Sequence, residues 1–177
     1  MTGRVISPVT HISYLKQNFI LTNTPTRDNI GTYISVLLRE KCRYLVCTCV
    51  VTNNVIDVNL FTKFGITVVN LSFPVGSFPT DDVIDKWLSL LREIGESKNQ
   101  TNSVAVNCLS GLGRAPVLIA IAMIESHCPY MDAISMIRKK RPGAFNRKQI
   151  LFLETYKQRL SHNYKSSVDI NSSCVIL

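Results

Sequence analysis

One segment carries most of the structural information in this chain: Ser103-Val104-Ala105-Val106-Asn107-Cys108-Leu109-Ser110-Gly111-Leu112-Gly113-Arg114-Ala115-Pro116-Val117-Leu118-Ile119. Its first residues are apolar and β-branched, which predicts a buried strand, and the apolar run from Val117 to Ile124 predicts a buried helix. The segment between them carries a cysteine, two glycines and an arginine. The stretch therefore predicts a strand, a tight loop and a helix in direct succession.

The loop has the composition of an anion-binding site. Backbone N–H groups of a short loop that enters a helix can point inward, and the positive end of the helix dipole adds to their attraction for phosphate. Gly111 and Gly113 allow the positive φ angles and close backbone approach that such a cradle requires. Arg114 can bind two phosphate oxygens at once. The predicted phosphate-binding residues are Leu109, Ser110, Gly111, Leu112, Gly113 and Arg114.

Cys108 and Arg114 are the predicted catalytic residues, because the five residues between them give the C-x5-R spacing of cysteine-dependent phosphatases. The positive field of the loop favours a thiolate, which is the nucleophilic form of cysteine. A buried structural cysteine with Arg114 on the surface is the alternative if the spacing stands alone, but the strand, both glycines and the apolar helix favour the phosphate loop. The stretch lacks the Gly-Lys-Ser/Thr of a nucleotide loop and the G-x-G-x-x-G of a dinucleotide turn.

Length and composition indicate one globular domain over residues 1–161 and a flexible tail over 162–177, where the sequence turns polar and aperiodic. The six cysteines form no C-x-x-C pairs, so neither a metal nor a cofactor is expected. We expect the domain to fold in the cytosol, because no secretory pattern or membrane-spanning stretch is present. The net charge of +8 suits phosphorylated proteins or anionic lipid, whereas no motif for nucleic acid accompanies it.

The alternation of strand and helix patterns predicts an α/β fold with a mainly parallel sheet flanked by helices, and with the phosphate loop between the last strand and the next helix. Strands are predicted at 11–16, 18–22, 44–51 and 66–73 and from Ser103. The first helix is predicted from a cap at Thr26 or Asp28 to Cys42, the second at 55–64, and the third from a cap at Thr80 to about residue 92. The helix after the phosphate loop is predicted to end at His127, and two more are predicted at 130–140 and 147–161.

The chain ends in Cys174-Val175-Ile176-Leu177, which matches a prenylation box whose terminal leucine favours a geranylgeranyl group. Chance is the alternative for so short a pattern. One prenyl chain anchors weakly and usually needs a second signal, for which basic residues are candidates if they are not simply solvated helix faces. These residues are Lys157, Arg159 and Lys165, and the cluster Arg138, Lys139, Lys140, Arg141, Arg147 and Lys148.

Over nearly its whole length the sequence resembles the protein tyrosine phosphatase type IVA family, the prenylated phosphatases of regenerating liver. Residues 70–87 in outline, 108–118, 143–146 and the Cys174 box carry the resemblance. It implies a dual-specificity-like cysteine-phosphatase fold and a phosphocysteine intermediate, at the cytoplasmic face of the plasma membrane or of endosomes. Ala115 stands where most cysteine phosphatases have a Ser or Thr that helps to release the phosphate, so the resemblance implies slow hydrolysis. It also implies a reversible Cys49–Cys108 disulfide, with a plain buried strand position as the alternative for Cys49.

Three departures from the family pattern matter. Asn107 replaces the histidine before the nucleophile, although its amide can still donate a hydrogen bond that orders the loop. Pro74 and Val75 replace an acidic pair, one member of which protonates the leaving oxygen. Pro142 replaces an arginine linked to partner binding. Asp81 and Asp82, with Asp85 nearby, are the candidates for a substitute acid, but carboxylates in the first turn of a helix are also explained by its dipole.

Two functions follow from these residues. The first is a protein-tyrosine, or dual-specificity, phosphatase of low intrinsic activity that acts on phosphotyrosine proteins at a membrane. The second is a binding module that captures a phosphate or an acidic side chain of a membrane protein without turnover. The resemblance adds the cyclin M magnesium transporters as partners, and the departures at Pro74, Val75 and Pro142 argue against them.

Overall fold

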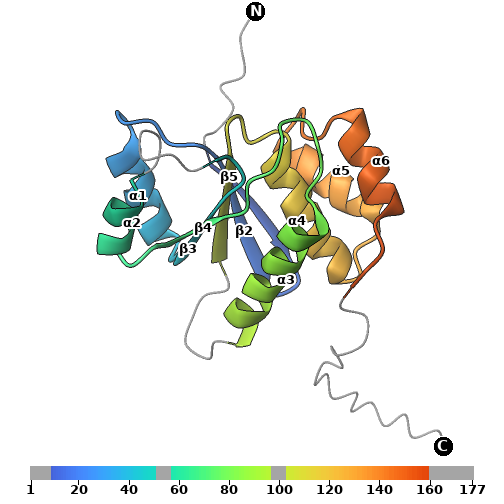
Figure 1. Cartoon of the computed structure of the whole chain (residues 1–177), viewed down its shortest axis with the longest axis horizontal. Coiled ribbons are helices and arrows are strands. Elements are labelled where there is room, and N and C mark those ends of the chain that lie inside the picture. Colours follow the sequence, from blue (N-terminus) through green and yellow to red (C-terminus); the bar gives the residue numbers. More distant parts are fainter. Residues whose placement is uncertain (1–8, 51–56, 97–102, 160–177) are drawn as a thin grey trace, which may run out of the picture.

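The computed structural model describes residues 9–50, 57–96 and 103–159, which form a five-stranded sheet between two sets of helices (Figure 1). The strands are β1 (Val9–Tyr14), β2 (Gln17–Asn23), β3 (Tyr44–Cys47), β4 (Thr67–Asn70) and β5 (Ser103–Cys108). The helices are α1 (Ile30–Arg39), α2 (Val58–Lys63), α3 (Asp81–Glu96), α4 (Arg114–Glu125), α5 (Tyr130–Lys140) and α6 (Arg147–Thr155).

The sheet has the order β1-β2-β5-β3-β4, and only β1 runs antiparallel to its neighbour. The prediction of a mainly parallel sheet is therefore confirmed. Because β5 lies between β2 and β3, the carboxyl ends of three parallel strands meet at one edge. The register pairs Asn23 with Cys108 and Cys47 with Asn107. The loop after β5 consequently begins in the middle of that edge, where parallel sheets bind ligands.

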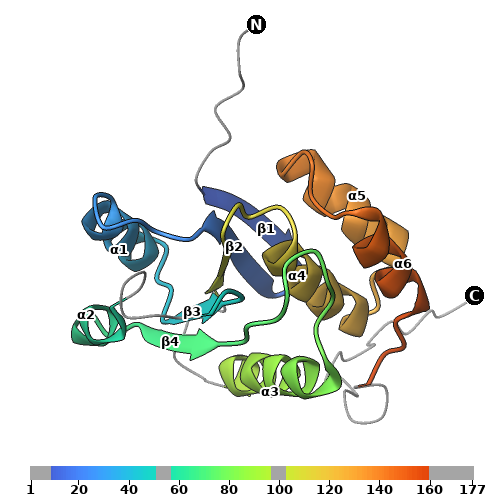
Figure 2. The ribbon, with the colours of Figure 1, turned by 45° about the horizontal axis from the view of Figure 1, so that its top comes forward.

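Two hydrophobic clusters cover the two faces of the sheet. Helices α1 and α2 pack on one face and α3 to α6 on the other, as Figure 2 shows. Every residue of α4 is buried, because this helix lies between the sheet and the helices α3, α5 and α6. The indole of Trp87 in α3 donates a hydrogen bond of 2.8 Å to the carbonyl of Leu118 in α4. The strand–loop–helix unit is thus the centre of the larger cluster.

The ends of several elements differ from the prediction. Helix α1 begins after Asn29, whose side-chain oxygen accepts the N–H of Thr26, so neither Thr26 nor Asp28 caps it. Strand β3 ends at Cys47, because the chain then turns toward the site. Helix α6 ends at Thr155, where the backbone of Tyr156 becomes extended (φ −66°, ψ 126°).

The tail at 162–177, including Lys165 and Cys174, lies outside the described residues. Within the ranges that the structure describes, no helix combines the length and the apolar character needed to cross a bilayer.

Candidate active site

The predicted phosphate-binding residues form the loop that joins β5 to α4. Cys108 ends the strand and is buried, and Gly113 precedes the first helical residue, Arg114. The carbonyl of Cys108 accepts the N–H groups of Thr24 (3.0 Å) and Gly111 (3.3 Å), so the loop folds back over the nucleophile. Gly111 has φ +65°, a conformation that glycine adopts without strain. The loop therefore has the tight shape that its sequence predicts.

The guanidinium of Arg114 is held at the site by three contacts. Nη1 donates to the carbonyls of Thr48 (2.9 Å) and Phe73 (3.1 Å), and Nη2 lies 3.0 Å from Sγ of Cys49. The residue is only 8% exposed. These contacts come from the segments that follow β3 and β4, so they orient the side chain before any ligand binds. A preoriented arginine loses little conformational freedom on binding an oxyanion.

Cys49 belongs to the site, because it contacts Arg114. Cys49 and Cys108 are both free thiols in this structure, as are Cys42, Cys47 and Cys128. The Cys49–Cys108 disulfide therefore stays a prediction. Burial raises the pKa of Cys42 and of Cys47 to about 12, so these two thiols are poor nucleophiles at neutral pH.

The side-chain amide of Asn107 does not order the loop, contrary to the expectation from sequence. Its side chain is fully buried on the face covered by α1, beside the Tyr33 hydroxyl and the Cys47 thiol. This follows from strand alternation, since neighbouring Cys108 faces the opposite side. The Asn107 carbonyl accepts both the N–H (3.0 Å) and the hydroxyl (2.8 Å) of Thr48. Through its backbone Asn107 fixes Thr48, which in turn binds Arg114.

The segment where the family has its acidic pair lies at the site. The carbonyl of Phe73 binds Arg114, and Pro74 and Val75 follow it directly. The amides of Asn146 and Gln149 then donate to the carbonyls of Gly76 (3.0 Å) and Ser77 (2.9 Å). The side chains of Pro74 and Val75 have no proton to donate.

Asp81 and Asp82 lie in the first turn of α3, exposed and ion-paired. Asp81 binds Arg159, which also lies 2.8 Å from Asp85, and Asp82 lies 2.8 Å from Lys86. These pairs fit the structural role of carboxylates at a helix N-terminus. A role for either aspartate as substitute acid remains a prediction.

Gln149 and Asn146 are site residues that the sequence interpretation missed. They form a capping box at the start of α6, in which each side chain binds the backbone of the other residue. Gln149 is fully buried, and its Nε2 lies 3.4 Å from where a Cβ on Gly113 would stand. Gln149 thus links α6, the Gly76–Ser77 turn and the phosphate loop. The Asn-x-x-Gln spacing before an apolar run was the available signal.

The prediction that Arg141 belongs to a basic surface cluster is wrong. Its side chain is fully buried, whereas Arg138, Lys139, Lys140, Arg147 and Lys148 are exposed. Its guanidinium donates to Thr10 Oγ1 (3.3 Å), to the Ser110 carbonyl (3.1 Å) and to the side-chain oxygen of Asn23. Arg141 therefore belongs to the site and not to a surface that could meet a membrane. Sequence alone cannot identify which arginine of a basic run turns inward.

Apolar side chains are exposed in and beside the loop, and we call them the mouth of the site. Val50 and Val75, in the segments that follow β3 and β4, are 68% and 79% exposed, and Leu109, in the loop itself, is 72% exposed. Phe78, which follows the Gly76–Ser77 turn, stacks on Phe152 with ring centroids 4.5 Å apart, and Lys148 Nζ lies 5.5 Å from the Phe78 centroid.

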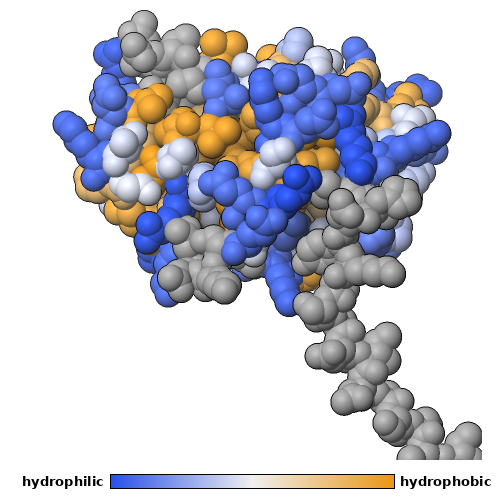
Figure 3. All heavy atoms as spheres, turned by 60° about the horizontal axis from the view of Figure 1, so that its bottom comes forward, coloured by the Kyte–Doolittle hydropathy of each residue, from blue (hydrophilic) through white to orange (hydrophobic). Residues whose placement is uncertain are grey.

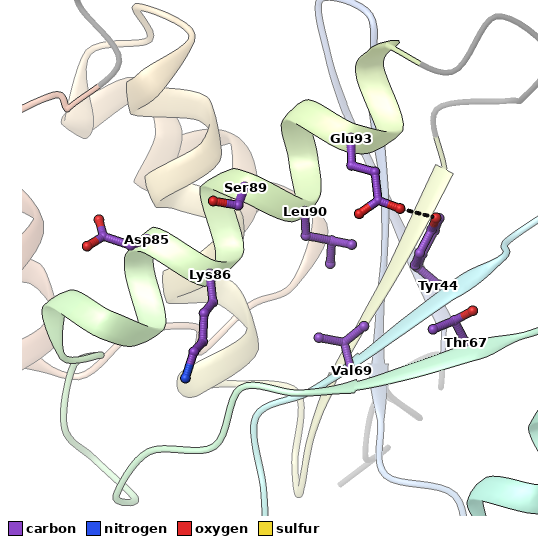
Figure 4. Close-up of a pocket in the computed structure, with 8 residues that line it drawn as sticks. All are labelled: Tyr44, Thr67, Val69, Asp85, Lys86, Ser89, Leu90 and Glu93. Atoms are coloured by element: carbon purple, nitrogen blue, oxygen red, sulfur yellow. Dashed lines mark hydrogen bonds between the residues drawn. The ribbon is translucent and has the colours of Figure 1, made fainter.

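A shallow groove elsewhere on the molecule lacks the chemistry of this site. It has a volume of about 500 Å³ and lies between α3 and the strands β3 and β4 (Figure 4). Tyr44 donates a hydrogen bond of 3.0 Å to Glu93 across it. Figure 3 shows hydrophobic residues gathered between hydrophilic ones on the face that carries α3. None of the lining residues belongs to the phosphate loop or contacts Arg114.

Proteins that bind phosphate on such a loop differ in the residue that begins it. Here the loop begins with a thiol and ends with an inward-facing arginine, which places the chain among the cysteine-dependent phosphatases.

Residues 74–156 match the model of the family described as protein-tyrosine phosphatase. The type IVA 3 phosphatase of Mus musculus is 39% identical over 167 residues, which are 94% of each chain. The PRL-1 phosphatase of Drosophila melanogaster is 40% identical over 155 residues, 88% of this chain and 86% of its own. The chain belongs to the protein tyrosine phosphatase type IVA family.

Solved structures agree with this assignment. A putative protein tyrosine phosphatase from Leishmania major superposes with a TM-score of 0.73 at 34% identity, over 85% of this chain and 99% of its own. The kinase associated phosphatase superposes with a TM-score of 0.68 at 18% identity, over 87% and 96% of the two chains, which shows the shared fold. The predictions of family and of fold are confirmed.

Substituting Gly111→Ala tests the shape of the loop. The added Cβ would lie 2.5 Å from Nη2 of Arg141 and 2.8 Å from Oδ1 of Asn23, at a positive φ. We expect the free energy of unfolding to fall by about 2 kcal/mol in urea titrations. Gly31→Ala is the matched control, because a Cβ at this helical position meets nothing within 4 Å. It should stabilise the protein by about 0.5–1 kcal/mol. Equal stability of Gly111→Ala and wild type would contradict the described loop.

Proposed function

We propose that this protein is a protein-tyrosine phosphatase of low intrinsic activity. The Cys108 thiolate attacks phosphorus, so an S–P bond forms while the P–O bond to the substrate breaks. Arg114 and the N–H groups of the loop residues 109, 110, 112 and 113 hold the oxyanions, and water then hydrolyses the phosphocysteine. The observation that best supports this is the buried guanidinium of Arg114, held by three contacts at the loop that Cys108 begins.

Two features support a low rate. Pro74 and Val75 supply no acid, and general acid catalysis typically contributes about 10²–10⁴-fold. Asp81 and Asp82 are already ion-paired at the start of α3. Ala115 presents a fully buried methyl group in the first turn of α4, where a hydroxyl would assist the second step. Both the first and the second chemical step are thus expected to be slow.

The mouth of the site favours aryl phosphates. The exposed side chains of Val50, Val75 and Leu109 offer contacts to an aromatic ring. A phenolic leaving group, with a pKa of about 10, also departs with less help from an acid than an alcohol does. Phosphotyrosine in proteins is therefore the favoured substrate class over phosphoserine and phosphothreonine.

The alternative function is capture of a phosphate or an acidic side chain without turnover. The arginines of the site and the missing carboxylate favour it, since nothing acidic at Pro74 or Val75 would repel a bound anion. Cyclin M transporters remain candidate partners through the family resemblance alone. Pro142, exposed where the family has an arginine, argues against them.

We also propose that the protein acts at the cytoplasmic face of the plasma membrane or of endosomes. Its anchor would be a geranylgeranyl group on Cys174. The exposed basic residues of α5 and α6 would supply the second signal: Arg138, Lys139, Lys140, Arg147 and Lys148. Lys157 is exposed as well, whereas the guanidinium of Arg159 is bound to Asp81 and Asp85.

Rapid-mix kinetics with an aryl phosphate test the enzyme directly. Reduced wild-type protein should release one equivalent of phenol in a burst and then turn over slowly, because hydrolysis of phosphocysteine limits the rate. Cys108→Ser should show neither phase. No burst in the wild type, together with tungstate binding that Arg114→Met abolishes, would instead support the binding module.

Substituting Val75→Asp tests the missing acid. A carboxylic acid at this exposed position next to the site should raise the rate constant of the first step with alkyl phosphates by about tenfold or more, and with aryl phosphates far less. Val75→Asn has the same shape without the proton and is the matched control. If the first step of the wild type is already similarly fast with both classes, a substitute acid exists, and Asp81→Asn and Asp82→Asn will show which residue it is.

Substituting Cys174→Ser tests the anchor. In cells, wild type should fractionate with membranes and the variant with the soluble fraction, because the prenyl chain requires the cysteine sulfur. Replacing Lys139 and Lys140 by Gln should weaken membrane association only partly. Unchanged partitioning of Cys174→Ser would refute the anchor.

A further inference from the structure

Arg141 and Arg114 lie on opposite sides of the end of β5. Arg114 binds groups that follow β3 and β4, whereas Arg141 binds Thr10 in β1 and Asn23 at the end of β2. Because β5 lies between β2 and β3, the phosphate loop is flanked by two buried arginines, each bound to groups of a different half of the sheet. Only Arg114 belongs to the C-x5-R motif.

The end of α5 directs the side chain of Arg141 inward. Its backbone N–H still bonds to the carbonyl of Ile137 (2.7 Å), but its φ of −130° and ψ of 80° are no longer helical. Pro142 contributes to this ending, because a proline disfavours the helical conformation of the residue before it. Lys139 and Lys140 stay exposed, while Arg141 turns into the interior.

Arg141 holds one peptide group of the loop. Nη2 donates to the Ser110 carbonyl at 3.1 Å. In a trans peptide the next N–H points the opposite way, and the Gly111 N–H accordingly bonds to the Cys108 carbonyl. Nη2 also packs so closely against Gly111 that a Cβ there would lie 2.5 Å from it.

The guanidinium also interacts with the nucleophile through its charge. Burial lowers the pKa of Arg141, and the negative charge of a Cys108 thiolate raises it. An arginine remains protonated at neutral pH, so Arg141 keeps its positive charge beside the loop. Among the described residues, the Cys49 thiol that follows β3 contacts Arg114, and Arg141 from the end of α5 binds the loop itself.

We propose that Arg141 is a positioning residue for the phosphate loop. It fixes the Ser110–Gly111 peptide and supplies a second positive charge beside the loop, which favours a bound oxyanion. This inference rests on the proposed role of the loop as the phosphate site. The proposed role applies to the buried Arg141 and not to the exposed Lys139 and Lys140 that precede it.

The test compares Arg141→Met with Lys140→Met in the full, reduced chain. Lys140→Met removes the same charge from the neighbouring, exposed position. The two readouts are tungstate affinity by calorimetry and the tungstate concentration that halves the rate of Cys108 alkylation by iodoacetamide, followed on its peptide by mass spectrometry. We expect Arg141→Met to raise both the dissociation constant and this concentration about tenfold. Lys140→Met should change neither.

Arg141→Lys separates charge from geometry. It keeps the charge without the planar fork, so both tungstate values should rise only about threefold. A folded Arg141→Met with wild-type values for both readouts overturns the proposal, whatever its melting temperature. If Arg141→Met does not fold, wild-type tungstate affinity in Arg141→Lys overturns it. A wild type that binds no tungstate refutes the phosphate site itself, and this inference with it.

Discussion

The parallel pairing of β5 with both β2 and β3 is the constraint on which the rest of the site depends. It brings three strand ends to one edge, and each end supplies part of the support for the loop. Asn23 from β2 binds Arg141, Thr48 after β3 binds Arg114, and Cys108 itself ends β5. Without that pairing, neither arginine would meet the groups that hold its side chain at the loop.

The site combines a complete anion-binding apparatus with an incomplete catalytic one. The loop, both arginines and the nucleophile are held by hydrogen bonds from all parts of the edge. The segment from Phe73 to Ser77 is held just as firmly, by Arg114, Asn146 and Gln149, yet it carries no acid. A well-ordered segment without a proton donor is consistent with both of the proposed functions, slow catalysis and capture.

The sequence predicted the loop and the fold because these depend on local patterns: β-branched residues before Cys108, glycines in the turn and an apolar helix after it. It could not predict Asn107 or Arg141 correctly, because the direction of a side chain depends on tertiary packing. Asn107 faces α1 by strand alternation, and Arg141 turns inward where α5 ends. The ends of β3 and α6 were also set by such contacts. The Asn146–Gln149 box was local and could have been found.

Helix α4 has no exposed face, and this limits how the pocket can adapt. A helix enclosed by a sheet and three other helices cannot shift without opening voids in a close-packed interior. Arg114 is therefore fixed by the packing of α4 as well as by its own hydrogen bonds. A change in the shape of the pocket would have to come from the segments around the loop, where Val50 and Val75 are exposed.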